Sequence, residues 1–191
     1  MTRVYTLLKE GFEEIEALTV VDFLRRADIE IFTVSTEKDL MVEGSHKIKV
    51  MADMMFSDLD LEDIDLLFIP GGMPAAKDLA DDPRVADLVQ KLDKRGRVLA
   101  AICAGPMVLA KGGALKGKEA TSYPGFDKFL EGIKEYKEDV LLVRDENVIT
   151  SRSVSTANYL ALALIELIKG TEKMKEIKAE VLLDKVEDLR S

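Results

Sequence analysis

Cys103 is the only cysteine in the sequence, and its neighbours are those of a nucleophile on a tight bend. It follows the apolar run Val98–Ile102, which predicts a buried strand, and it precedes Gly105-Pro106 and an apolar helical pattern. Proline suits a first helical turn, and small residues suit a sharp passage from strand to helix. A small residue two positions before the nucleophile and a glycine two after it are the spacing of a serine-hydrolase nucleophile elbow, with sulfur in place of oxygen.

The N–H groups at such an apex, together with the positive end of the following helix, favour thiolate over thiol. We therefore expect a lowered pKa for Cys103 and a reactive side chain. The alternative is a buried structural cysteine, because a free cysteine often behaves as a small apolar residue.

A glycine pair, Gly71-Gly72, directly follows the apolar run Leu66–Ile69. The pair is too short to cradle a phosphate and lacks the Lys-Ser/Thr of a nucleotide-binding loop. Beside a nucleophile, unhindered N–H groups form an oxyanion hole, and the N–H groups of Gly72 and Ala104 are the candidate donors. The alternative is a tight turn without a function.

Three glutamates follow the first strand-like run, and one of them is a candidate acid–base group. We expect two of these acids to lie in water at the start of a helix. Glu16 lies at a different helical angle from Glu13 and Glu14, nearer the apolar side with Ile15. A carboxyl buried there has a raised pKa, stays protonated and can donate a hydrogen bond to a thiolate. An ordinary solvated glutamate is the alternative.

His46 is the only histidine, and it lies in the turn-like segment Gly44–Lys47, far in sequence from Cys103. We expect a surface residue, so that a Cys-His dyad would need a long reach. Acidic residues are plentiful, but no cluster of histidine or cysteine accompanies them, so no metal site is expected.

Strand-like and helical patterns alternate along the chain. The predicted strands are 4–8, 29–34, 66–69, 98–102, 120–121, 140–143 and 148–150, with a hairpin over 41–51. The predicted helices are 13–27, 83–94, 107–110, 126–130, 156–169 with Ser155 as its cap, and a charged C-terminal helix at about 171–189 with Met174, Ile177, Val181 and Leu182 as its apolar stripe. This order predicts an α/β fold in a single domain over residues 1–191, with a mostly parallel sheet covered on both faces. Such sheets carry their sites at the carboxyl ends of the strands, where the three loops described above would meet.

Composition excludes several classes of protein. The net charge of −9, with no basic stripe to offset it, argues against nucleic acid as a partner. No uncharged run is long enough for a membrane helix, and charged residues near the N-terminus argue against a signal peptide. The single cysteine fits a reducing compartment, and we expect a cytoplasmic protein.

Four motifs together resemble the ThiJ/PfpI family, in the DJ-one-like branch of the Parkinsonism-associated deglycase. They are Gly11–Glu16, Pro70–Gly72, Ala100–Pro106 and Thr150–Arg152. The resemblance runs nearly end to end and implies a flavodoxin-like three-layer sandwich related to the class I glutamine amidotransferases, usually as a homodimer. It also implies Cys103 as the reactive thiol, Glu16 as its carboxyl partner, and Gly72 and Ala104 as the backbone donors.

Two positions depart from the family pattern. Ala104 stands where the peptidase branch places histidine directly after the cysteine, which argues against a cysteine peptidase. Tyr123-Pro124 stands where the deglycase branch has a His-Pro pair, and a tyrosine phenol is a poor base at neutral pH. Acid–base work then falls to Glu16, and Gly71, Tyr123, Pro124 and Arg152 are further candidates for the substrate pocket.

The resemblance therefore implies a cysteine-dependent, glutathione-independent glyoxalase or deglycase that acts on small α-oxoaldehydes or their glycated adducts. It implies no cofactor. The alternative, from a different class, is a non-catalytic redox sensor or chaperone in which the same thiol is oxidised.

Overall fold

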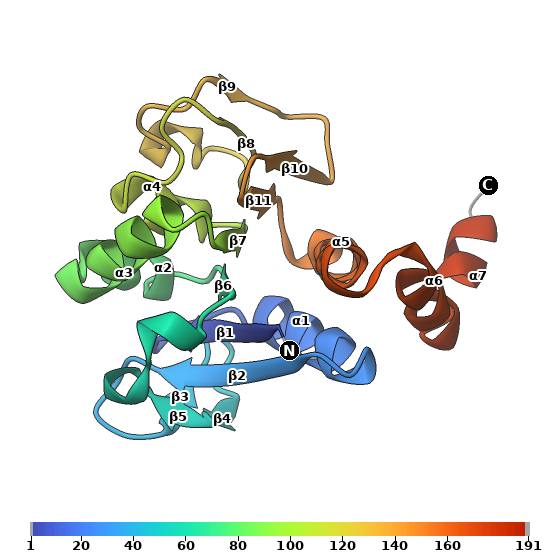
Figure 1. The fold of residues 1–191 in the computed structure, drawn as a ribbon, viewed down its shortest axis with the longest axis horizontal. Helices are drawn as coiled ribbons and strands as arrows, with labels where there is room; N and C mark the ends of the chain where they lie inside the picture. Colours follow the sequence, from blue (N-terminus) through green and yellow to red (C-terminus); the bar gives the residue numbers. More distant parts are fainter. Residues whose placement is uncertain (1, 190–191) are drawn as a thin grey trace.

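The computed structural model describes residues 2–189, which form a central sheet of seven strands (Figure 1). In spatial order the strands are β10 (Leu142–Asp145), β11 (Val148–Ser151), β7 (Val98–Ile102), β6 (Leu66–Ile69), β1 (Arg3–Leu8), β2 (Glu30–Ser35) and β5 (Met54–Met55). Every neighbouring pair in this sheet is parallel except β10 and β11, which form an antiparallel hairpin. The mostly parallel sheet that the sequence predicts is therefore confirmed.

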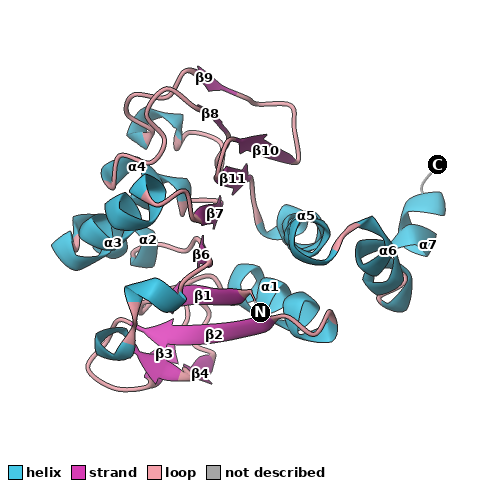
Figure 2. Ribbon diagram, in the orientation of Figure 1, coloured by secondary structure: helices cyan, strands magenta, loops and turns pink. Residues whose placement is uncertain are grey.

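Helices cover both faces of this sheet, as Figure 2 shows in cyan. One face packs against α2 (Ala75–Asp81), α3 (Pro83–Lys94) and α4 (Pro106–Lys111). The other packs against α1 (Glu14–Arg26), α5 (Ala157–Lys169) and α6 (Thr171–Glu180). Leu67 and Leu99 pack on the first side and their neighbours Phe68 and Ala100 on the second, which is the alternation of a strand buried on both faces.

Helix α3 shows how the sequence sets these boundaries. Its side chains at positions 85, 88, 89 and 92 are buried, and they recur at the spacing of one helical face. Pro83 occupies the first turn, and the side chain of Asp82 accepts a hydrogen bond from the Arg84 N–H, which caps the helix. The predicted bounds, 83–94, are confirmed.

Short elements extend this frame. The predicted hairpin is confirmed as β3 (Met41–Glu43) and β4 (Lys49–Met51), which pair with each other apart from the main sheet. A second small sheet pairs β8 (Glu119–Ala120) with β9 (Glu135–Tyr136). The 3-10 turns are η1 (Phe56–Asp58), η2 (Leu61–Asp63), η3 (Asp127–Phe129) and η4 (Val154–Thr156). Helix α2 and strand β5 have no predicted counterpart, because each is too short to show a period.

The single C-terminal helix predicted at about 171–189 is wrong within the described residues. Helix α6 ends at Glu180, and α7 (Leu183–Asp188) begins after Leu182, whose backbone is left-handed with φ of 59°. The chain thereby changes direction, and Lys178 pairs with Glu187 across the break at 2.7 Å. Leu182 is 51% exposed, so it does not belong to the apolar stripe, whereas Ile177 is fully buried.

Ser155 is not the cap of α5, because that helix begins after Thr156 and the Thr156 hydroxyl bonds to residues 151–153 of the preceding turn. Within residues 2–189, no helix is both long and apolar enough to cross a membrane.

A buried lysine joins three segments on one side of the sheet. Lys118 is only 7% exposed, and its Nζ lies 3.0 Å from an Asp93 carboxylate oxygen. The same Nζ donates to the Ala114 carbonyl and to the Asn147 side chain, each at 2.9 Å. These bonds fix the chain after α4 to the end of α3 and to the β10–β11 hairpin. Removing the cation takes away the side-chain donor of the Ala114 carbonyl and of the Asn147 side-chain oxygen.

We predict that Lys118→Ala lowers the free energy of unfolding by about 2 kcal/mol, the scale of hydrogen bonds to a charged group. Urea unfolding followed by circular dichroism measures this change. Lys116→Ala removes an exposed lysine from the same turn and should leave stability unaltered. Equal stability of the two variants would contradict a structural role for Lys118.

Candidate functional site

Cys103 lies at the apex of a strained turn between β7 and α4. Its backbone is left-handed, with φ of 62°, a conformation that costs energy for a residue with a side chain. Its N–H donates to the Ser151 carbonyl at 3.1 Å, and its carbonyl accepts from the Tyr123 N–H at 2.9 Å. The end of β11 and the segment after β8 therefore hold this apex, and the predicted elbow is confirmed.

Glu16, from the first turn of α1, meets Cys103 across Gly71. The Glu16 side chain is fully buried, and its Oε2 accepts the Gly71 N–H at 2.8 Å. A Cβ at Gly71 would lie 2.5 Å from that oxygen and 2.7 Å from the Cys103 Cβ. Only glycine leaves room for the acid and the thiol to approach each other here. The predicted burial of Glu16 beside the thiol is confirmed.

The electrostatics of this pair differ in part from the expectation. Burial raises the pKa of Glu16 to about 7, against smaller opposing effects of hydrogen bonds from Cys103 and Gly71. Burial also raises the pKa of the Cys103 thiol, and the negative charge of Glu16 adds to that rise. The expected lowering of the thiol pKa is therefore wrong. The Ala104 N–H acts in the expected direction, but burial and a neighbouring acid outweigh it.

Two adjacent buried acids cannot both carry a charge at neutral pH, so at least one of them keeps its proton. Glu16 Oε2 already accepts the Gly71 N–H, whereas Oε1 is buried and has no hydrogen-bond partner of its own among residues 2–189. Oε1 is thus the oxygen free to carry the proton. A thiolate at Cys103 is accessible only while that proton stays on Glu16.

The two proposed backbone donors are free of competing backbone acceptors. In the part of the chain that the structure describes, neither the Gly72 N–H nor the Ala104 N–H donates to a backbone oxygen. The Ala104 N–H instead interacts with the Cys103 thiol. Ala104 N also lies 3.1 Å from the place of a Cβ at Gly71, so both donors lie on loops that border the thiol. Their role in holding an oxyanion stays a prediction.

The remaining candidates for the substrate pocket are Tyr123, Pro124 and Arg152, and they differ in exposure and contacts. Tyr123 is next to Cys103 through its backbone, and its side chain is 46% exposed. Pro124 is exposed beside it. The Arg152 guanidinium donates to the carbonyls of Lys137 and Glu138, so this side chain holds the loop before β10.

Two acids at the start of α1 depart from the expectation of solvated residues. Glu14 is 2% exposed, and the side chain of Glu13 is 13% exposed. Ile15, expected on the apolar side with Glu16, is instead 55% exposed. The charge of Glu13 is the smallest of the influences that raise the pKa of both Glu16 and Cys103, so Glu13 lies near the site. The sequence of α1 alone does not predict the burial of Glu13 and Glu14, because the segments that cover them are distant in sequence.

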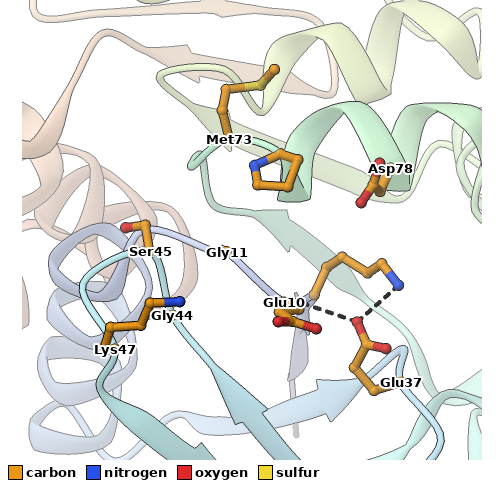
Figure 3. Close-up of a pocket in the computed structure, with 10 residues that line it drawn as sticks. Glu10, Gly11, Glu37, Gly44, Ser45, Lys47, Met73 and Asp78 are labelled. Atoms are coloured by element: carbon orange, nitrogen blue, oxygen red, sulfur yellow. Dashed lines mark hydrogen bonds and ion pairs between the residues drawn. The ribbon is translucent and has the colours of Figure 1, made fainter.

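A cleft of about 250 Å³ lies beside the first loop of this site (Figure 3). Gly11 and Met73 form one part of its wall, and Ser45 and Lys47 of the β3–β4 turn form another. At its far end, Glu37 accepts the Glu10 N–H and pairs with Lys9. Neither Cys103 nor Glu16 lines this cleft, so it is a separate opening next to the thiol site.

A family model described as the DJ-1/PfpI family matches residues 2–167. The chain belongs to the DJ-1/PfpI family. Protein dj-1beta of Drosophila melanogaster is 33% identical over 177 residues, 93% of this chain and 95% of that protein. The Parkinson disease protein 7 homolog of Danio rerio is 31% identical over 183 residues, with 95% and 97% covered. A Caenorhabditis elegans protein named glutathione-independent glyoxalase DJR-1.2 is 32% identical over 178 residues, with 92% and 93% covered.

Solved structures of DJ-1/PfpI proteins share this fold. The crystal structure of Drosophila melanogaster DJ-1beta matches with a TM-score of 0.90 at 32% identity, over 95% of this chain and 97% of that one. An oxidized form of Toxoplasma gondii DJ-1 matches with a TM-score of 0.87 at 32% identity, over 95% and 98%. The flavodoxin-like fold expected from the resemblance is confirmed.

Replacing Glu16 tests the electrostatic coupling between the two acids of this DJ-1/PfpI protein. Glu16→Gln removes the neighbouring negative charge that raises the thiol pKa, so Cys103 should be alkylated by iodoacetamide at a lower pH than in the wild type. Alkylation rates measured across pH give the midpoint. Asp22→Asn, at an exposed acid of the same helix, should leave the midpoint unchanged. An unchanged or higher midpoint in Glu16→Gln would contradict the coupling.

Proposed function

We propose that this protein is a cysteine-dependent, glutathione-independent glyoxalase or deglycase that converts small α-oxoaldehydes, or their adducts, to 2-hydroxy acids. The observation that supports the proposal is the buried carboxyl of Glu16 beside the strained Cys103, with one oxygen free to carry a proton. A nucleophile and a proton donor in contact are what addition to an aldehyde requires.

In the first step the Glu16 carboxylate takes the thiol proton of Cys103, and the resulting thiolate adds to the aldehyde carbon. The carbon–sulfur bond forms as the carbonyl π bond breaks, and the electron pair moves to the oxygen. The N–H groups of Gly72 and Ala104 stabilise this oxyanion. Glu16 then gives its proton to the oxygen, which yields a hemithioacetal and leaves a carboxylate near the former aldehyde carbon. A carboxyl with a pKa of about 7 is suited to both roles at neutral pH.

The second step is an isomerisation. The Glu16 carboxylate takes the proton from the former aldehyde carbon, and the neighbouring carbon receives a proton, while the hydroxyl proton passes to the neighbouring oxygen. The product is a thioester of a 2-hydroxy acid. Water then breaks the carbon–sulfur bond, releases the acid and restores the thiol. The sum is α-oxoaldehyde plus water to 2-hydroxy acid. The aldehyde carbon is oxidised and the neighbouring carbonyl carbon is reduced, so the reaction needs no external oxidant, reductant or cofactor.

The named glyoxalase of Caenorhabditis elegans, at 32% identity, supports this reaction type. The departure at Tyr123 bears on its rate. A phenol can orient a substrate by a hydrogen bond, but it does not replace a base with a pKa near 6.5.

A redox sensor is the second candidate, and the solved oxidized form of the Toxoplasma gondii relative favours it. In this function the Cys103 thiolate attacks a peroxide, its sulfur takes one oxygen, and water or an alcohol leaves. A second equivalent of peroxide gives the sulfinate, which the protonated Oε1 of Glu16 would stabilise by a hydrogen bond.

Turnover of methylglyoxal distinguishes the two functions. We predict that Cys103→Ser abolishes lactate formation, and that Glu16→Gln lowers it by about 10²–10⁴-fold, the usual contribution of general acid–base catalysis. Asp22→Asn is the matched control. Wild-type turnover in Glu16→Gln would remove Glu16 from the mechanism. Absence of turnover in the wild type, with peroxide oxidation of Cys103 intact, would favour the sensor.

Restoring the histidine of the deglycase branch tests the role of position 123. Tyr123→His supplies an imidazole on the residue whose N–H bonds to the Cys103 carbonyl. We predict a gain in methylglyoxal turnover of about 10-fold, below the full range of base catalysis because the ring lacks tailored partners. Phe129→His places the same group on an exposed residue of the following turn and should give no gain. A loss of turnover in Tyr123→His would mean that the phenol itself acts in the reaction.

A further inference from the structure

Three metal-ligating side chains meet outside the thiol site. Glu13 and Glu14 come from the start of α1, and His46 comes from the turn between β3 and β4. One ligand atom from each residue lies within 4.8 Å of the other two. His46 is 32 positions away from Glu14, so the folded hairpin brings the imidazole to the helix.

The separations of the imidazole nitrogen from the two carboxylates are close to those between ligand atoms in a zinc site. His46 Nδ1 lies 2.9 Å from Glu14 Oε2 and 3.6 Å from Glu13 Oε1. In a tetrahedral zinc site with bonds of about 2.0–2.1 Å, neighbouring ligand atoms are about 3.3 Å apart. The hydroxyl of Ser45 lies 3.0 Å from Nδ1 and 3.1 Å from an oxygen of each glutamate, where a fourth ligand or a water would complete the polyhedron.

The protein holds one of these carboxylates in place before any ligand arrives. The Glu14 side chain is 3% exposed, and its Oε1 accepts the His46 N–H at 2.7 Å, so Oε2 faces the imidazole. A Cβ at Gly44 would overlap the Glu14 carboxylate. The turn therefore has a glycine where the carboxylate needs the space, which is the kind of outer support that orients metal ligands.

Charge and access also favour a cation. Among the described residues, His46 is the only basic side chain in an ion pair with either glutamate. The His46 side chain is 69% exposed, and Ser45 lines the cleft of about 250 Å³ in Figure 3, so an ion can enter from water.

We propose that Glu13, Glu14 and His46 form a binding site for a divalent first-row transition-metal ion, with Zn²⁺ as the ion that fits the donor set and spacing. Imidazole nitrogen with carboxylate oxygen suits this class, whereas Mg²⁺ and Ca²⁺ take oxygen ligands. The Glu13 N–H donates to the Gly71 carbonyl at 2.9 Å, so the ion would tie the β3–β4 turn to the loop that carries the glycine pair.

The test uses the full chain with Cys103→Ser, so that the thiol cannot bind the metal. After treatment with a chelator, calorimetric titration with Zn²⁺ should show one ion per chain. His46→Asn and Glu13→Gln, both at residues that leave the buried Glu14 in place, should each weaken binding at least 10-fold. Glu131→Gln, at an exposed acid distant in sequence, is the matched control and should bind as before.

A second readout identifies the ligand directly. The sequence has a single histidine, so every imidazole signal in an NMR spectrum belongs to His46. Zn²⁺ should shift these signals in step with the calorimetric binding, and Mg²⁺ at the same concentration should not. Zn²⁺ binding that survives unchanged in His46→Asn, imidazole signals that do not respond to Zn²⁺, or no binding at all would each overturn the proposal. None of these readouts depends on glyoxalase turnover.

Discussion

Cys103 and Glu16 cannot both carry a negative charge at neutral pH, and this constraint shapes the candidate active site. Cys103 cannot ionise without Glu16 keeping its proton, because both side chains are largely buried and the charge of one raises the pKa of the other. The sheet holds this arrangement, since Glu16, Gly71 and Cys103 follow the neighbouring strands β1, β6 and β7 respectively.

Features set by short-range chemistry could be predicted from the sequence. The elbow at Cys103 needs small residues and a helix that begins with proline, and both features occur within three positions of Cys103 in the sequence. The sequence of helix α3 contains both its N-terminal cap and its apolar period, so the predicted bounds agree with those in the structure. Glu16 was identifiable because its helical angle differs from that of Glu13 and Glu14.

Features that depend on long-range packing could not be predicted. The burial of Glu14 requires the β3–β4 turn to fold over the start of α1. The residues near Glu14 in sequence do not predict that contact. The sequence predicts that His46 lies at the surface, which is confirmed, but it does not predict which residues contact the imidazole. The direction of the Cys103 pKa shift was wrong for a similar reason: the helix that follows has six residues, and its N–H groups act against burial and a neighbouring carboxyl that only the fold brings together.

Gly71 has a consequence for how this site can be lost in evolution. Any glycine codon becomes an alanine codon through one base change, and the added methyl group would occupy the space in which the acid and the thiol meet. The core around the sheet would be untouched, so the fold would persist while the pair of acids moved apart. A descendant could then keep both Cys103 and Glu16 and still be inert. Whether a relative of this protein is active must therefore be judged from the glycine between the two acids as much as from the acids themselves.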